Sequence, residues 1–171
     1  MSVSRYTVRV SKDYLVFSSG HFITYAGDQC ERIHGHNYRV SVEVEDDLDV
    51  NHYVFDFLAL RDLTRAVAEE LDHRMLLPTR SRFITLDEDG PNWLVRFGER
   101  RWSFPRDECV LLPIANTTAE LLAGHIADRL RQLMLDGGLK LPRLARVEVE
   151  ECFGQSAVVE REWGAVSSSE G

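Results

Sequence analysis

The chain has 171 residues, of which 44% are hydrophobic and 28% are charged, so it can build a folded domain and does not have the composition of a disordered chain. Its formal net charge of −8 argues against a general binder of nucleic acid or of membrane surfaces, because such proteins usually carry a basic face. No apolar run approaches about 18 residues, residues 1–10 lack a signal-peptide pattern, and the three cysteines do not form a disulfide framework. We therefore expect a cytoplasmic protein without nucleic-acid or membrane partners.

The first half of the chain predicts two strands and a helix. Residues 6–17 are rich in β-branched and aromatic residues, which indicates one long strand. Residues 37–45 alternate strictly between apolar and polar side chains, which indicates a second strand with one buried face. The connection of about twenty residues between them suggests a functional loop, because long connections without a role are uncommon. A helix is expected over residues 56–71, where apolar residues recur at spacings of three and four.

The middle of the chain predicts an insertion followed by a second helix. Residues 78–113 form a long irregular section, in which the segments WLVRF and RRWSF flank a Gly-Glu turn as an added hairpin. The next helix is expected to begin at Thr117, because Thr117 and Glu120 have the spacing of a capping box. The two glycines at 137–138 are expected to end it.

The last part of the chain completes the expected architecture. Residues 144–151 and 157–163 read as strands, and residues 165–171 read as a frayed tail. The order is therefore two strands, a helix, an inserted hairpin, a helix and two strands. This order predicts one α+β domain over residues 1–171, with an antiparallel sheet and two helices on one face.

The segment CERIHGH, residues 30–36, gathers candidate metal and catalytic residues. His34 and His36 are two residues apart at the start of an alternating strand, so both imidazoles should project from the same face. Antiparallel pairing would bring His21 beside them, and a catalytic zinc needs three protein ligands and one open position. Any one histidine is more often a hydrogen-bonded core or surface residue than a ligand. Cys30 has three readings: a reactive thiol, a fourth ligand of a closed structural site, or a small buried apolar residue.

Two further positions each have a functional and a structural explanation. Asp72 can orient the imidazole of His73 for acid–base chemistry, but the local sequence favours simple helix termination there. Glu151 shares the parity of Val147 and Val149, so its carboxylate should point toward the apolar face, where it would need a hydrogen-bonding partner. A guanidine-like ligand edge would satisfy it in bidentate fashion. The alternative is a strand-end residue turned to water.

Together these pieces resemble one protein family. FSSGH, CERIHGHNY, DFLALRDL, LDHRML and NTTAELLA, followed by a strand that ends in Glu151, are similar to the motifs of the 6-pyruvoyltetrahydropterin synthase and 6-carboxytetrahydropterin synthase family. The resemblance runs over residues 16–159, with residues 78–113 outside it. It implies the tunnelling fold, in which a four-stranded antiparallel sheet carries two helices and the subunits join into trimeric barrels and hexamers with shared active sites.

The resemblance also implies a role for each polar residue. The ligands of a zinc ion would be His21, His34 and His36. Cys30 would be the catalytic thiol, Asp72 and His73 would be the supporting pair, and Glu151 would anchor a pterin ring. The implied substrate is 7,8-dihydroneopterin triphosphate, with zinc as a Lewis acid and a thiolate as the base.

The spacing of the cysteine and histidines favours one branch of the family. The compact Cys-x3-His-Gly-His arrangement resembles the carboxy-forming enzymes of queuosine and deazapurine synthesis. We therefore expect 6-carboxy-5,6,7,8-tetrahydropterin, acetaldehyde and triphosphate as products, with the pyruvoyl product as the alternative. A different zinc enzyme on the same scaffold, a paralogue that acts on another pterin, and a zinc-stabilised binding module are the competing hypotheses.

Overall fold

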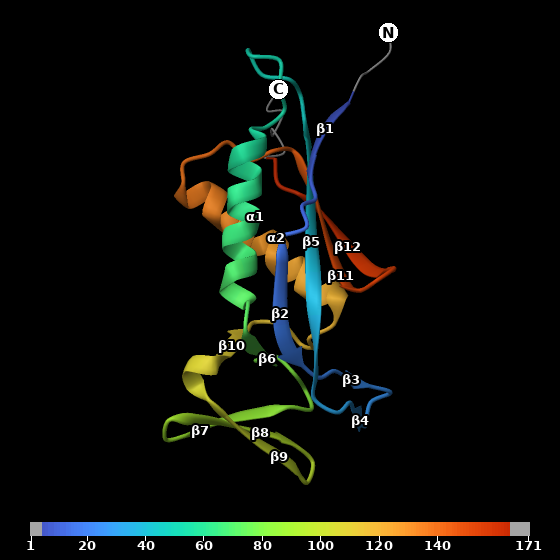
Figure 1. Ribbon diagram of the computed structural model, residues 1–171, viewed down its shortest axis with the longest axis vertical. Coiled ribbons are helices and arrows are strands. Elements are labelled where there is room, and N and C mark those ends of the chain that lie inside the picture. Colours follow the sequence, from blue (N-terminus) through green and yellow to red (C-terminus); the bar gives the residue numbers. More distant parts are fainter. Residues whose placement is uncertain (1–4, 165–171) are drawn as a thin grey trace, which may run out of the picture.

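The computed structural model describes residues 5–164, so the tail expected over residues 165–171 lies outside the described residues. A main sheet carries two helices, and a smaller three-stranded sheet lies at the lower end of the molecule (Figure 1). The strands of the main sheet are β1 (Tyr6–Val10), β2 (Val16–His21), β5 (His34–Asp46), β6 (Arg74–Pro78), β10 (Cys109–Leu112), β11 (Leu144–Cys152) and β12 (Gln155–Glu162). Their order is β10-β6-β2-β5-β11-β12, and β1 pairs with β5 on the same side as β2.

The single strand expected over residues 6–17 is wrong, because the chain forms two strands there. β1 pairs with the second half of β5 and β2 with the first half. Between them the chain leaves the sheet in a turn, in which the Leu15 N–H donates to the Lys12 carbonyl at 3.0 Å. Val10 and Phe17, on either side of the turn, are both buried. The excursion therefore lets two short strands share one long partner while each keeps its apolar residues in the core.

The main sheet is larger than expected and is not wholly antiparallel. The antiparallel part consists of β1 and β2, then β5, β11 and β12. β6 runs parallel to β2, and β10 runs parallel to β6. These two strands have five and four residues, which is too short to show a clear period of two. β10 lies inside the section that reads as irregular, and β6 ends at its first residue.

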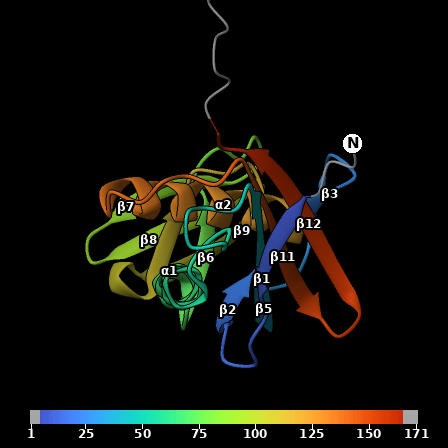
Figure 2. The same cartoon turned by 90° about the horizontal axis from the view of Figure 1, so that it is seen from above.

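Two helices cover one face of the main sheet, as the alternation of buried positions predicts (Figures 1 and 2). They are α1 (Phe57–Leu71) and α2 (Ala119–Asp136). The carboxylate of Asp56 accepts the Leu58 N–H at 2.7 Å and caps α1, which satisfies a backbone donor that the helix itself leaves free. Both helices and the sheet share one apolar core.

The capping box expected at the start of the second helix is wrong. α2 begins two residues later than expected, and its N-cap residue Thr118 makes no side-chain capping bond. The buried hydroxyl of Thr117 instead donates to the Phe22 carbonyl at 2.9 Å. That bond ties the entry of α2 to the residue that follows β2.

The section between the helices contains a second, smaller sheet. Its strands are β7 (Thr85–Asp89), β8 (Asn92–Phe97) and β9 (Arg100–Pro105). β8 and β9 form the expected hairpin, with Gly98 at φ +54° in the turn, and β7 adds a third strand. The sheet has an apolar cluster of its own, in which Val95 packs with Phe22 and Met75 of the main body. A short 3-10 helix, Arg106–Glu108, leads from β9 to β10.

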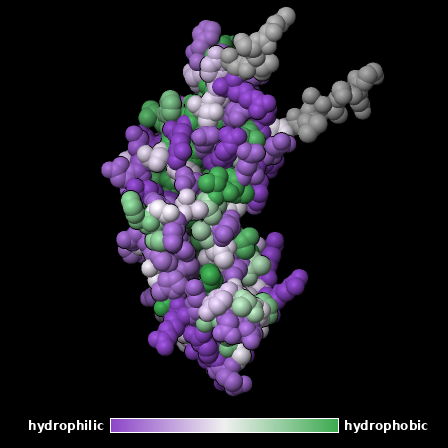
Figure 3. Space-filling view, turned by 90° about the vertical axis from the view of Figure 1, so that its right-hand side faces the viewer, coloured by the Kyte–Doolittle hydropathy of each residue, from purple (hydrophilic) through white to green (hydrophobic). Residues whose placement is uncertain are grey.

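The long loop after β2 contains a small ribbon of two short strands. They are β3 (Thr24–Tyr25) and β4 (Gln29–Cys30), which pair with each other and are not part of the main sheet. Figure 3 shows a mostly hydrophilic surface on the side of the molecule that it presents, with scattered apolar side chains. Within residues 5–164, neither helix is both long enough and apolar enough to cross a membrane.

Candidate metal centre

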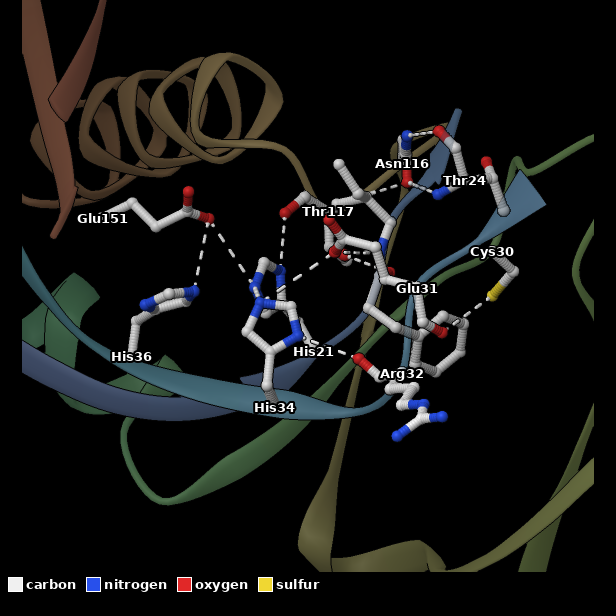
Figure 4. A network of polar contacts seen from close by, with 12 residues as sticks. His21, Thr24, Cys30, Glu31, Arg32, His34, His36, Asn116, Thr117 and Glu151 are labelled. Carbon is white, nitrogen blue, oxygen red and sulfur yellow. Dashed lines mark hydrogen bonds and ion pairs between the residues drawn. The ribbon is translucent and has the colours of Figure 1, made fainter. Parts of the chain in front are cut away.

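Three imidazoles converge where β2 ends and β5 begins. His21 and His34 are direct cross-strand partners, and His36 lies two residues further along β5 on the same face. Their Nε2 or Nδ1 atoms all lie within 4.8 Å of one another. Figure 4 shows the three rings turned toward a common space, with Glu151 above His36. The antiparallel pairing therefore brings together the three histidines that the sequence singled out.

Backbone carbonyls fix the tautomers of two of these rings. His21 Nδ1 lies 3.0 Å from the Thr117 carbonyl, and His34 Nδ1 lies 2.9 Å from the Arg32 carbonyl. Since a carbonyl can only accept, each Nδ1 carries the proton and each Nε2 presents a lone pair. The two Nε2 atoms lie 3.2 Å apart. Two lone pairs this close repel each other, and a shared cation would relieve the repulsion, as in metal sites whose histidines are oriented by carbonyl groups.

The environment of His21 favours the neutral form that binds metals. His21 is 1% exposed, and burial lowers the pKa of its imidazole, an effect to which the neighbouring His34 and His36 add. The bond that His21 donates to the Thr117 carbonyl and the charge of Glu151 oppose the shift without reversing it. A deprotonated Nε2 is the form that a metal ion needs, so the residues present fit a metal ion with nitrogen ligands.

Glu151 brings a carboxylate to the same place. Its Oε1 lies 3.6 Å from His21 Nε2 and 3.9 Å from His36 Nε2, and the Tyr38 hydroxyl donates to it at 3.5 Å. Burial, followed by the charge of Glu151, raises the pKa of Tyr38, so the phenol stays protonated and keeps donating. The pairing of β11 with β12 shifts register between Glu150 and Cys152, which marks a bulge at Glu151.

A pocket of about 290 Å³ opens beside Glu151. It lies against the first turn of α2, where Thr118 and Ala119 line it, and it reaches the start of β12 at Gln155. The first backbone N–H groups of a helix have no partner within the helix, so this wall offers donors while Glu151 offers an acceptor. The pocket can therefore hold a flat, polar ring close to the three histidines.

Cys30 is not part of the histidine cluster. Its thiol donates to the Glu31 carbonyl at 3.5 Å, and its side chain packs against the apolar cluster of the small sheet. Figure 4 shows the thiol separated from the imidazoles by Glu31, with its bond directed to the Glu31 carbonyl. Burial raises the pKa of Cys30, and the nearby Arg100 opposes that shift only in part, so this conformation favours the neutral thiol.

Glu31 is the residue that the sequence reasoning missed. Its Oε2 lies 3.9 Å from His34 Nε2 and accepts the Ile23 N–H at 3.4 Å. Its carboxylate therefore reaches toward the histidines from the ribbon that also carries Cys30 (Figure 4). The sequence signal for Glu31 is its position three residues before His34. The same segment also contains the thiol of Cys30, to which the family resemblance assigns the catalytic role.

Asp72 and His73 form a pair beside Ser18 in β2, outside the set of three converging imidazoles. Asp72 Oδ1 accepts the Ser18 N–H at 2.7 Å, and His73 Nδ1 lies 2.8 Å from Asp72 Oδ2. Ser18 precedes His21 by three residues, which is about 10 Å along a strand. The side chain of His73 is 83% exposed. His73 lines a groove of about 530 Å³ that also includes His36, Arg74 and Glu108. The bond from the Ser18 N–H lowers the pKa of Asp72, so its carboxylate stays ionised beside His73.

Comparisons with known proteins agree with this geometry. The model of a family described as 6-pyruvoyl tetrahydropterin synthase matches residues 9–162. The chain belongs to this family. A Methanocaldococcus jannaschii protein provisionally named 6-carboxy-5,6,7,8-tetrahydropterin synthase is 32% identical over 148 residues, which are 84% of this chain and 88% of that protein. A Pyrococcus furiosus dihydroneopterin monophosphate aldolase is 30% identical over 136 residues, which are 80% of this chain and 83% of that protein.

Solved structures of the family share the fold. The 6-pyruvoyl tetrahydropterin synthase of Plasmodium falciparum matches with a TM-score of 0.85 and 28% identity, over 94% of this chain and all of that chain. The Plasmodium vivax enzyme, in a variant with a glutamate described as a catalytic residue replaced by alanine, matches with a TM-score of 0.81 and 26% identity over the same shares. The chain is thus similar to members named for different reactions on pterins.

Removing one imidazole tests the metal centre. We expect His36→Ala to lose bound metal, because two ligands on one side of the site do not hold an ion as three do. Metal content after dialysis, measured by inductively coupled plasma mass spectrometry, checks this. His52→Asn is the matched control, because His52 is exposed and lies at φ +66°, a conformation that asparagine tolerates. Equal metal content in wild type and His36→Ala, with unchanged circular dichroism, would contradict the ligand assignment.

Proposed function

We propose that this protein is a zinc-dependent lyase that converts 7,8-dihydroneopterin triphosphate to 6-carboxy-5,6,7,8-tetrahydropterin, acetaldehyde and triphosphate. The observation that carries the proposal is the set of three imidazoles, two of them held with Nε2 free, directly beside a pocket with a carboxylate. Nitrogen ligands in a set of three suit zinc with an open position. Family membership and the Methanocaldococcus jannaschii relative support a pterin as the substrate and the carboxy product.

The proposed binding mode places the pterin ring in the pocket beside Glu151. The carboxylate of Glu151 would accept two N–H groups from the guanidine-like edge of the ring, and the Tyr38 hydroxyl would hold the carboxylate in place. The ring would lie against the first turn of α2, with its side chain directed to the histidines. Zinc bound there would supply Lewis acidity toward the hydroxyl oxygens of that side chain.

The proton that leaves carbon needs a base, and the chain offers two candidates. Glu31 already points toward His34, and the Plasmodium vivax enzyme has a glutamate described as a catalytic residue. Cys30, the thiol that the family resemblance favours, would have to rotate its side chain out of the apolar cluster before it could act. We therefore propose Glu31 as the base in this conformation and retain Cys30 as the alternative.

The exposed His73 supports a site shared between subunits. Within one chain it lies beside Ser18, three residues before His21, and its side chain is largely exposed in a groove that His36 also lines, while its partner Asp72 keeps it oriented. A neighbouring copy could present this pair to the metal centre, where His73 would relay protons. We propose a homo-oligomer, a trimer or a hexamer, in the cytoplasm, with a role in queuosine or deazapurine synthesis.

Product analysis tests the reaction. The zinc-loaded protein is incubated with 7,8-dihydroneopterin triphosphate, and the products are identified by mass spectrometry. We expect 6-carboxy-5,6,7,8-tetrahydropterin and acetaldehyde. A pyruvoyl product would support the proposed site but assign the protein to the pyruvoyl-forming branch of the family. An aldol cleavage product would place the chain with the aldolase relative, and no turnover with zinc bound would contradict the lyase proposal.

Two substitutions on the ribbon decide which residue is the base. If Glu31 takes the proton, Glu31→Gln should lower kcat by about 10²–10⁴-fold, and Cys30→Ala should leave most of the activity. Steady-state kinetics with zinc content measured in parallel check this. Asp28→Asn is the control, because Asp28 lies exposed on the same loop and its carboxylate, among residues 5–164, accepts a side-chain bond only from its neighbour Gln29. The opposite ranking of the two variants would assign the base to Cys30.

Mixed oligomers test the sharing of the site. His36→Ala removes a metal ligand and His73→Ala removes the exposed imidazole, so each variant alone should be inactive. If His73 serves the metal centre of a neighbouring copy, co-expression of the two variants should restore part of the activity. Turnover of the purified mixed oligomer is compared with that of each variant. If oligomers that contain both variants show no recovered turnover, each active site is formed by residues of a single chain.

A further inference from the structure

The inserted sheet contacts the ribbon that carries Cys30 and Glu31 through one arginine. Arg100, the first residue of β9, donates from Nη1 to the Cys30 carbonyl at 2.7 Å and from Nη2 to the Glu31 carbonyl at 3.1 Å. The planar guanidinium thus holds two consecutive carbonyls, whose peptide planes set the direction in which the Glu31 side chain leaves the backbone. The only other side-chain donor to either carbonyl within residues 5–164 is the Cys30 thiol, which contacts the Glu31 carbonyl at 3.5 Å.

Arg100 is itself held in place by an aromatic stack that ends beside the metal centre. Its guanidinium carbon lies 4.9 Å from the centre of the Trp102 ring. Trp102 stacks on Phe22 with centroids 5.0 Å apart, and Phe22 is buried and directly follows His21. Figure 1 shows the three-stranded sheet below the β3–β4 ribbon. One strand of the insertion therefore contacts both segments that carry the candidate base and the first histidine.

The ribbon has few other restraints. β3 and β4 have two residues each, and the turn between them includes Ala26 at φ 49° and Gly27 at φ 81°. On the β3 side, Asn116 accepts from and donates to the backbone of Thr24 at 3.1 and 2.8 Å. On the β4 side, Arg100 provides the corresponding side-chain anchor. Without it, the two carbonyls would bond to water. The end of the ribbon would keep the bond from the Glu31 N–H to the Ile23 carbonyl at 3.0 Å and the bond from the Ile23 N–H to the Glu31 carboxylate at 3.4 Å, and with fewer anchors it would move more.

We propose that Arg100 is a positioning residue: its guanidinium fixes the Cys30 and Glu31 carbonyls and so aims the Glu31 carboxylate at the histidine cluster. The insertion is then a support for the catalytic ribbon and not a separate module. The kinetic consequence rests on the proposed lyase function, whereas the ordering of the ribbon does not. The experiment separates the two.

Hydrogen–deuterium exchange measures the ordering without any substrate. We expect Arg100→Ala to speed amide exchange in residues 24–33 and to leave exchange in residues 85–97 close to that of wild type. Arg101→Ala is the matched control, because Arg101 is the exposed next residue on the same strand and loses the same charge. Unchanged exchange in residues 24–33 would overturn the proposal. Faster exchange across both segments would also overturn it, since the arginine would then act by stabilising the inserted sheet.

Kinetics measure the consequence for catalysis. A base displaced by about 1 Å can cost about 10²-fold in rate, so Arg100→Ala should lower kcat by about 10- to 100-fold with little change in KM. Arg100→Lys keeps the charge and one donor and should recover part of kcat, while Arg101→Ala should match wild type. Equal kcat for the Arg100 and Arg101 alanine variants would overturn the positioning role. If wild type itself shows no turnover, the lyase proposal fails and the exchange experiment alone decides the role of Arg100.

Discussion

The register of β2 against β5 is the constraint on which the whole site depends. His21 faces His34 because these two residues are cross-strand partners at the end of the pairing, and His36 follows on the same face. Since side chains alternate along a strand, a slip of one residue would turn both β5 histidines to the opposite face and leave His21 alone. The buried aromatic pair Phe17 and Tyr38, which are partners in the same register and stack at 4.7 Å, opposes such a slip. The core thus fixes the geometry of the metal centre.

Much of this site could be predicted from the sequence because it follows a period of two. His34 and His36 share the parity of Tyr38, and Glu151 shares the parity of Val147 and Val149, so the sequence alone indicates a common face. What the sequence could not show was any contact between distant segments. The Thr117 hydroxyl bonds to the Phe22 carbonyl, 95 residues away, where the sequence suggested a local helix cap. For the same reason Arg100, 69 and 70 residues from its two acceptors, gave no signal.

The fold was predicted less completely than the site. The alternation of β5 and the helical spacing of α1 are strong local patterns, and both elements lie close to their expected bounds. The break between β1 and β2 has no clear signal, because residues on both sides of it favour strands. β6 and β10 are short and apolar and lie at or within a section that reads as irregular, and only their parallel pairing beside β2 defines them. The insertion accordingly contains the three-stranded sheet β7–β9 and the edge strand β10 of the main sheet, where a single hairpin was expected.

At the ribbon, the structure differs from what the CERIHGH motif suggests. The adjacent residues Cys30 and Glu31 leave the backbone in different directions, so only one of them can face the histidines at a time. In this conformation the carboxylate does so, and the thiol belongs to the apolar cluster of the inserted sheet. In the proposed reaction, the choice between these two residues as the base therefore depends on how the ribbon is anchored as well as on the chemistry of the side chains.

A crystal structure of the zinc-loaded protein with an unreactive pterin bound tests the central claim most directly. Anomalous scattering at the zinc edge locates the ion, and the electron density locates the ring. The account predicts one zinc ion on the Nε2 atoms of His21 and His34 and on His36, with the pterin ring held by Glu151 against the start of α2. Zinc bound elsewhere, or a ring bound away from Glu151, would contradict it.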